Sequence, residues 1–179
     1  MRFDAEASMR CWGVALSIGG RDYAIPPLAA GPWLTAITTP SYRAIVPGLV
    51  RGLSNDDLLD AMVARQVKVA DLDQAAREAI AEISGMRWWS ATRLAAWLVG
   101  NWHTLGSAVL SRGLKMDTDP LASVLVVAYR VILENCKDEQ ERQKVDIELD
   151  LAPRGVAAEE MFDQQAARAA FMALADAPE

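Results

Sequence analysis

One segment constrains the fold of this chain more than any other. Residues 85–106, GMRWWSATRLAAWLVGNWHTLG, hold four of the chain's six tryptophans. On a helix that turns about 100° per residue, one face gathers large and small apolar side chains. They are Trp88, Ala91, Ala95, Leu98, Trp102, Leu105 and Val109. This stripe predicts a helix whose core face organises the rest of the chain.

The same helix is apolar on a second side. Trp89, Ala96 and Trp97 point away from the stripe, and Arg93 lies four residues from each of these tryptophans, within reach of their rings. Such a helix is either packed on all sides or keeps one side for a partner, and the sequence leaves both open. Tryptophan and arginine dominate interface hot spots, so Trp89, Arg93 and Trp97 are our candidate partner-binding residues.

Other segments predict further helices and two irregular regions. Glycine and asparagine at 100–101 and glycine at 106 predict a bend or break in the tryptophan helix. Residues 38–52 are rich in proline and glycine and predict a connection. The charged segment 137–155 predicts a helix that gives way to an extended stretch at 145–151. Capping patterns and apolar spacing predict helices at 28–37, 54–67, 71–85, 117–136 and 157–177.

Near the N-terminus, residues 14–25 (VALSIGGRDYAI) read as a β-hairpin. Gly19 and Gly20 suit a two-residue turn, because both positions need a positive φ. This turn places Leu16 opposite Tyr23 and pairs residue 14 with residue 25. The paired apolar side chains then share one face, which must pack on another element, since an isolated hairpin is marginal in water.

These patterns predict a mainly α fold. We expect a single helical domain at 1–153 with the hairpin at about 14–25, followed by an acidic C-terminal helix or tail at 154–179 that either docks or swings free. Residues 1–133 carry 13 Lys/Arg and 12 Asp/Glu, whereas residues 134–179 carry 5 and 12. The negative charge therefore belongs to the C-terminal part. Phe162 and Phe171 in this part are further candidate partner-binding residues.

The charge and composition exclude several partners. An acidic chain without a basic stripe does not fit nucleic acid, and no polybasic patch fits an anionic membrane. The longest apolar runs are shorter than the roughly 20 residues that span a bilayer. Cys11 and Cys136 match no zinc or disulfide framework, and the N-terminal residues lack the apolar core of a signal peptide. We therefore expect a cytoplasmic protein.

No segment predicts an active site, a metal site or a cofactor. His103 is the single histidine, which leaves a catalytic triad or a metal cluster with one member. Asp117 and Asp119 form an Asp-x-Asp pair, but Pro120 directly after them favours helix capping by Asp119. The glycines at 19–20 are followed by no helix, which argues against a phosphate loop. The sequence therefore predicts a protein that is not an enzyme.

Three segments in this order carry a resemblance to a known family. They are LSIGGRDYAIPPLAAGPWLTAI, MRWWSATRLAAWLVGNWHTLGSAVLSRG and DPLASVLVVAYRVILENCKDEQERQKVDIELDLAP. Together they resemble the tail assembly chaperones of long-tailed phages that infect actinobacteria, over most of residues 14–153. The N-terminal residues and the final ARAAFMALADAPE take no part in it.

The resemblance implies a function and a set of partners. Such chaperones coat the long helical tape measure protein in the host cytoplasm before tail-tube subunits polymerise around it, and they are absent from the finished virion. The implied partners are the tape measure protein and the tail tube protein, and a homo-oligomer is an open possibility. The alternatives are a virion structural protein of the tail or head-tail connector, and a small enzyme that uses His103.

Overall fold

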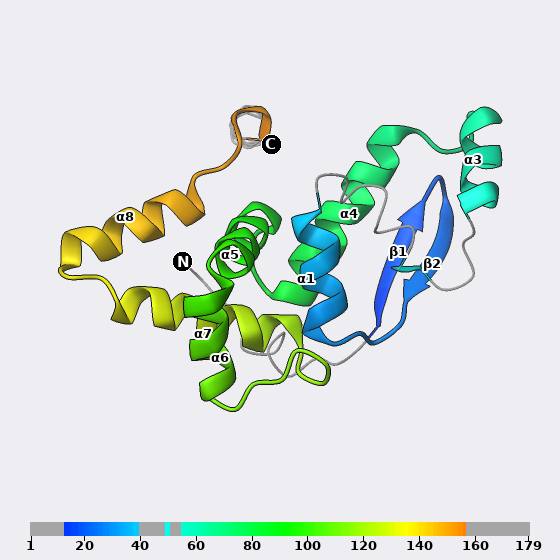
Figure 1. Ribbon diagram of the computed structural model, residues 1–179. Coiled ribbons are helices and arrows are strands. Elements are labelled where there is room, and N and C mark those ends of the chain that lie inside the picture. The colour runs from blue at the N-terminus through cyan, green and yellow to red at the C-terminus, as the bar shows by residue number, and fades with distance from the viewer. Residues whose placement is uncertain (1–12, 40–48, 51–54, 157–179) are drawn as a thin grey trace, which may run out of the picture.

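The computed structural model describes residues 13–39, 49–50 and 55–156. The chain is mainly helical with an antiparallel hairpin at the N-terminal end, which confirms the predicted fold class (Figure 1). The elements are β1 (Val14–Ile18), β2 (Arg21–Ile25), α1 (Ala30–Thr38), α3 (Asn55–Val63), α4 (Val69–Ser84), α5 (Trp88–Gly100), the π-helix η2 (Trp102–Gly106), α6 (Ser107–Ser111), α7 (Leu121–Glu134) and α8 (Glu139–Asp150).

The hairpin has the predicted register. Leu16 pairs with Tyr23 and Val14 pairs with Ile25. Gly19 and Gly20 have φ values of 59° and 78°, in the left-handed region that the turn requires. Inward side chains of β1 are buried and its alternate side chains are exposed, and β1 packs on α4. The hairpin thus covers one end of the helical core, as its apolar face demands.

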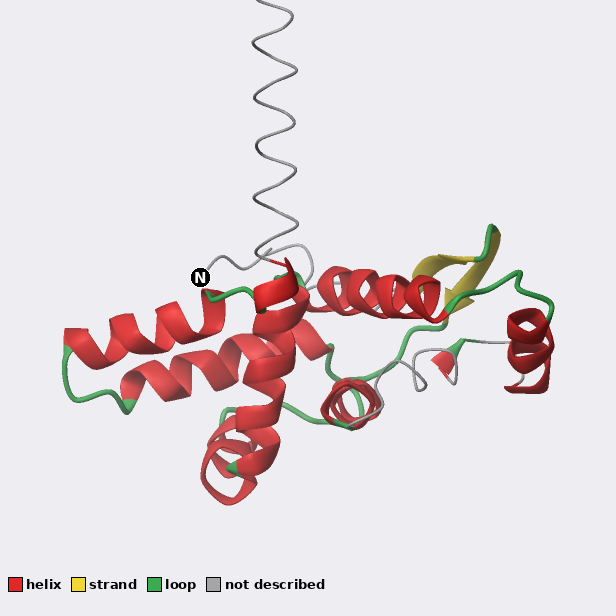
Figure 2. Ribbon diagram, turned by 90° about the horizontal axis from the view of Figure 1, so that it is seen from above, coloured by secondary structure: helices red, strands yellow, loops and turns green. Residues whose placement is uncertain are grey.

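Helix α5 lies at the centre of the fold. It contacts α1, α4, α7 and α8, and the chain continues from it into η2 (Figure 2). Ala91, Leu94, Ala95 and Leu98 of α5 are fully buried in the main core. The break predicted near residue 100 is present, because α5 ends at Gly100 and Asn101 leaves the helical region at φ −113°, ψ 35°.

Helix α4 begins earlier than its sequence suggests. Asp71 was the expected N-cap, but Lys68 occupies that position, and the carboxylate of Asp71 accepts a hydrogen bond from the Lys68 backbone N–H at 2.7 Å. The Asp71 side chain therefore caps the first turn from the third position inside the helix, as the last residue of a capping box does. Gly85 ends the helix in the left-handed region, as predicted.

The loop before α7 also differs from expectation. Helix α7 begins at Leu121, and Asp119 accepts a hydrogen bond from the Lys115 backbone N–H at 2.6 Å instead of capping the helix. The carbonyls of Asp119 and Met116 each accept a backbone N–H from the first turn of α1, both at 2.8 Å. This loop therefore satisfies donors that the start of a helix leaves free.

The extended stretch predicted at 145–151 is wrong, because α8 continues as a helix to Asp150. Alternation of apolar and acidic residues in this stretch is typical of a strand, but Val145 and Leu149 are also four residues apart. Both contribute to the core, with Leu149 fully buried. Asp138 accepts the Glu141 N–H at 2.8 Å and caps the helix. Packing on one helical face therefore decides the conformation.

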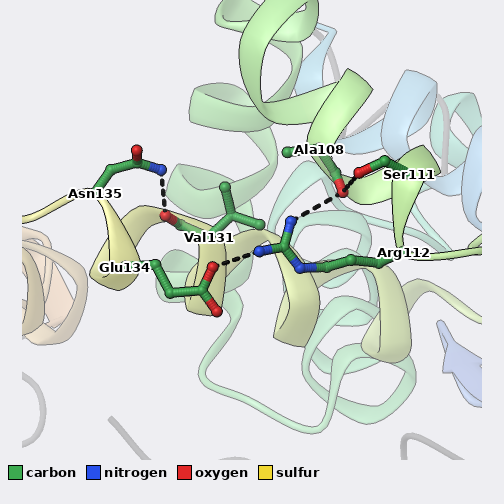
Figure 3. A network of polar contacts seen from close by, with 6 residues as sticks. All are labelled: Ala108, Ser111, Arg112, Val131, Glu134 and Asn135. Carbon is green, nitrogen blue, oxygen red and sulfur yellow. Dashed lines mark hydrogen bonds and ion pairs between the residues drawn. The ribbon is translucent and has the colours of Figure 1, made fainter.

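Short polar contacts fix α6 against α7. Arg112 forms an ion pair with Glu134, and its guanidinium also donates to the Ala108 carbonyl at 3.1 Å (Figure 3). Asn135 closes the end of α7 by donating its side-chain amide to the Val131 carbonyl at 2.7 Å. These bonds hold the end of α7 at the point where the chain turns toward α8.

Two regions of the sequence analysis fall outside the described residues. The connection predicted at 38–52 is described at 38–39, where α1 ends, and at 49–50. The helix predicted at 157–177, with Phe162 and Phe171, lies wholly outside them. The division of the chain at residue 153 therefore stays a prediction.

Candidate partner-binding site

The outer face of α5 is the side turned away from the main core, formed by Trp89, Arg93, Ala96 and Gly100. Trp89 was predicted to be available to a partner, yet its side chain is buried, with 6% exposed. Helix α8 lies against this part of α5. In the isolated chain, the N-terminal half of the outer face is therefore already covered.

Three side chains of α5 hold the C-terminal end of α8. The Ser90 hydroxyl donates to the Leu149 carbonyl at 2.8 Å, and Trp89 Nε1 donates to the Asp150 carbonyl at 3.4 Å. The Arg93 guanidinium donates to the Glu148 carbonyl at 2.6 Å and to the Leu151 carbonyl. We call Trp89, Ser90 and Arg93 the helix-end site.

The chemistry of the helix-end site matches the end of a helix. The last four carbonyls of an α-helix have no partner within the helix and carry partial negative charge. The donors of the site reach four successive carbonyls, those of residues 148–151, and Arg93 adds a positive charge there. This arrangement binds a helix C-terminus through its backbone.

The arginines that lie near the indole rings of α5 are not the one expected from the sequence. Arg93 was expected to reach the rings of Trp89 and Trp97, but its guanidinium bonds to the α8 carbonyls. Arg87 lies 5.2 Å from the Trp89 ring centroid, and Arg77 of α4 lies 4.8 Å from that of Trp88. Trp88 and Trp89 themselves meet edge to face at 5.7 Å. The Arg93 guanidinium thus binds the backbone of α8.

The C-terminal half of the outer face is open. Ala96 and Gly100 are exposed, and a Cβ built on Gly100 would meet no atom within 4 Å. Val99 is 44% exposed beside them. Trp97 is half-buried and packs against the core, so it borders this open half and is not a fully exposed anchor. Helix α5 is thus covered by other elements over its N-terminal half and exposed on one side over its C-terminal half.

Trp102 was expected in the core stripe, but 38% of its surface is exposed. The reason is the break at Asn101 followed by the wide π-turn, in which hydrogen bonds join residues five apart. The indole packs on Gly106, where an added Cβ would lie 2.5 Å from Trp102 Cδ2. Leu105 and Val109 remain buried, so the break turns Trp102 outward while the next two stripe residues stay in the core.

Trp102 lines a groove between α5, α1 and the loop before α7. This Trp102 groove has a volume of about 450 Å³ and is lined by Gly31, Leu34, Thr35, Thr38, Thr39, Val99, Trp102 and Met116. The three threonine hydroxyls donate to carbonyls of α1 four residues earlier, at 2.6–3.1 Å. The groove therefore needs no polar partner and suits apolar side chains.

His103 is exposed on η2, and no group of three metal-ligating side chains occurs in residues 13–39, 49–50 and 55–156. Cys136 is half-buried, and its thiol contacts the Ile132 carbonyl. None of the helices in the described part is long and apolar enough to cross a membrane.

Sequence reasoning found part of this site and missed part. It singled out Trp89 and Arg93, which the fold brings together, but it missed Ser90 and Leu149 because their roles depend on where α8 docks. The exposure of Trp102 had one signal, the glycine and asparagine at 100–101. That signal predicts a break but not the direction in which the indole turns.

Comparison with known proteins adds no relative. The chain matches no protein-family model, no curated protein and no solved structure.

Proposed function

We propose that this protein is a phage tail assembly chaperone that binds and solubilises the helical tape measure protein in the host cytoplasm. The observation that carries the proposal is the apolar surface formed by the open half of the α5 outer face and the adjoining Trp102 groove. The resemblance of residues 14–153 to such chaperones supplies the identity of the client. No catalytic or cofactor role is part of the proposal.

This surface has the properties that a helical client requires. An amphipathic helix binds a groove through apolar anchors spaced three and four residues apart. Trp102 offers a large, rigid apolar area, and Ala96 and Gly100 allow the client backbone to come close. A long helical protein with an apolar stripe aggregates when it is left uncovered, so a protein that covers the stripe keeps it in solution.

The charge of the chain supports the same role. Residues 134–179 carry 5 Lys/Arg against 12 Asp/Glu, so they add a charge of −7 to a client complex, and this like charge opposes contact between complexes. Tail tube subunits are proposed as later partners that displace the chaperone, and self-association of the chaperone is compatible with this scheme. Nucleic acid and membranes are not proposed partners.

Substitutions in the open surface test the proposal. Val99→Glu places a charge at the edge of the groove, and Trp102→Ala removes its largest ring. Each is expected to weaken binding to the tape measure protein at least tenfold, about 1.4 kcal/mol, as hot-spot residues do. The measurement is co-expression with the tape measure protein, followed by titration of the soluble complex.

The matched control is Val63→Glu on α3, where 83% of the valine is exposed away from α5. It makes the same change in charge and is expected to leave binding intact. Wild-type binding by Val99→Glu and Trp102→Ala, with thermal midpoints near that of the parent, contradicts the proposed surface. Detection of the chain in purified virions would instead favour the alternative, a structural protein of the tail or connector.

A further inference from the structure

The helix-end site is occupied by the chain's own α8, which covers it in the free protein. We infer that Trp89, Ser90 and Arg93 form a receptor for the C-terminal turn of a helix, and that α8 is an internal occupant which the end of a client helix displaces. The inference rests on the proposed function for the identity of the client. The site itself is defined by contacts within this chain.

The site recognises features that many helices share. Among the described residues, the hydrogen bonds of its three side chains end on carbonyl oxygens of residues 148–151. The buried apolar anchor beneath these carbonyls is Leu149. A second helix that ends with a leucine in the same position presents the same carbonyls and the same anchor. The site therefore does not distinguish α8 from such a helix by its polar contacts.

Helix α8 is suited to leave this position. Leu149 is its one fully buried side chain, and most of the other residues of α8 are exposed. Ile147 and Leu151 remain 66% and 63% exposed even in the docked state. The sequence of α8 is rich in charged residues, so water solvates the helix after it undocks. Residues 135–138 keep it tethered to α7, which gives the docked state a high effective concentration.

Release of α8 enlarges the client surface. The covered half of the α5 outer face, at Trp89 and Arg93, adjoins the open half at Ala96 and Gly100 along one side of the same helix. Without α8, a client helix can follow the whole length of α5. The free protein therefore keeps Trp89 covered until a client replaces α8, which limits the apolar surface that is exposed beforehand.

A peptide added in trans tests the exchange. The probe is a fluorescein-labelled, C-terminally amidated peptide with the sequence of residues 138–152, DEQERQKVDIELDLA. In the full-length chain, Leu149→Asp places a carboxylate at a buried position and undocks the internal α8. We expect the peptide to bind this variant at least tenfold more tightly than the wild-type chain, by fluorescence anisotropy.

Two further variants make the result specific. Adding Ser90→Ala and Arg93→Met to Leu149→Asp removes donors of the receptor and is expected to abolish peptide binding. Asp146→Ala removes the acceptor of the Tyr129 hydroxyl from the internal α8, whereas the peptide keeps it, so a smaller gain in peptide binding than with Leu149→Asp is expected. It also keeps the test valid if Leu149→Asp fails to fold by circular dichroism.

Equal peptide affinity for the wild-type, Leu149→Asp and Asp146→Ala chains overturns the inference, as does absence of binding to folded variants. The assay contains no tape measure protein. If the peptide assay fails while the chain still binds the tape measure protein, the displacement of α8 is refuted and the proposed function is not. If the peptide binds as expected but the tape measure protein does not bind, the proposed function is refuted and the exchange of α8 is not.

Discussion

Shortening Leu149 to alanine tests how much one side chain contributes to the docking of α8. Leu149 is fully buried against α5, and its neighbour Val145, one turn away, is half-buried. The change removes about three methyl or methylene groups at about 0.8 kcal/mol each, and the cavity adds to this loss. Leucine-to-alanine changes in cores cost about 2–5 kcal/mol. We expect about 2–3 kcal/mol, because a helix at the edge of the fold can collapse around the gap.

We expect the loss of stability in Leu149→Ala to appear as local opening of α8, before the whole chain unfolds. The helix can leave α5 while the main core around α4, α5 and α7 stays packed, since stability is not uniform across a structure. Hydrogen exchange followed by mass spectrometry measures this opening over residues 139–151. Faster exchange in Leu149→Ala is expected there, with little change over α4.

The matched control is Ile147→Ala, an apolar truncation on the same helix at an exposed position. Its effect is expected to lie within about 0.5 kcal/mol, as for ordinary surface substitutions. Equal exchange rates in the two variants, or a loss below about 0.5 kcal/mol for Leu149→Ala, would refute the argument that burial of this side chain holds α8.

Two further predictions concern the π-turn and the pairing of α7 with α8. Gly106→Ala places a Cβ 2.5 Å from the Trp102 ring, so we expect a displaced indole, altered tryptophan fluorescence and weaker client binding. The control is Gly155→Ala, whose Cβ meets no atom within 4 Å and which is expected to leave the indole, client binding and stability unchanged. Burial, together with the hydrogen bond to Asp146 and the charge of that carboxylate, raises the pKa of Tyr129 far above its ordinary value. The protonated form is favoured in the folded state, so this stabilisation is complete below the ordinary tyrosine pKa of about 10 and is lost as pH rises above it. Hydrogen exchange of α8 is therefore expected to gain an additional pH dependence above about pH 10, and Tyr129→Phe should remove it.

Local sequence was enough to predict the hairpin and most helices. The alternation in β1 and the two glycines at its turn specify both the conformation and the register, since the turn length fixes which residues pair. Gly85 ends α4 for an equally local reason, its positive φ. Helix starts were less well predicted at Asp71 and Asp119, because a carboxylate can bond to any nearby backbone N–H and its sequence position does not say which.

The roles of the tryptophans were decided by tertiary structure. The sequence placed two apolar sides on α5, and this much follows from helical periodicity alone. It could not tell that α8 covers Trp89, because the alternating residues 145–151 suit a strand as well as a helix until Val145 and Leu149 meet the core. Nor could it tell that the π-turn directs Trp102 outward. Periodicity determines which residues share a face, whereas burial depends on which distant segment packs there.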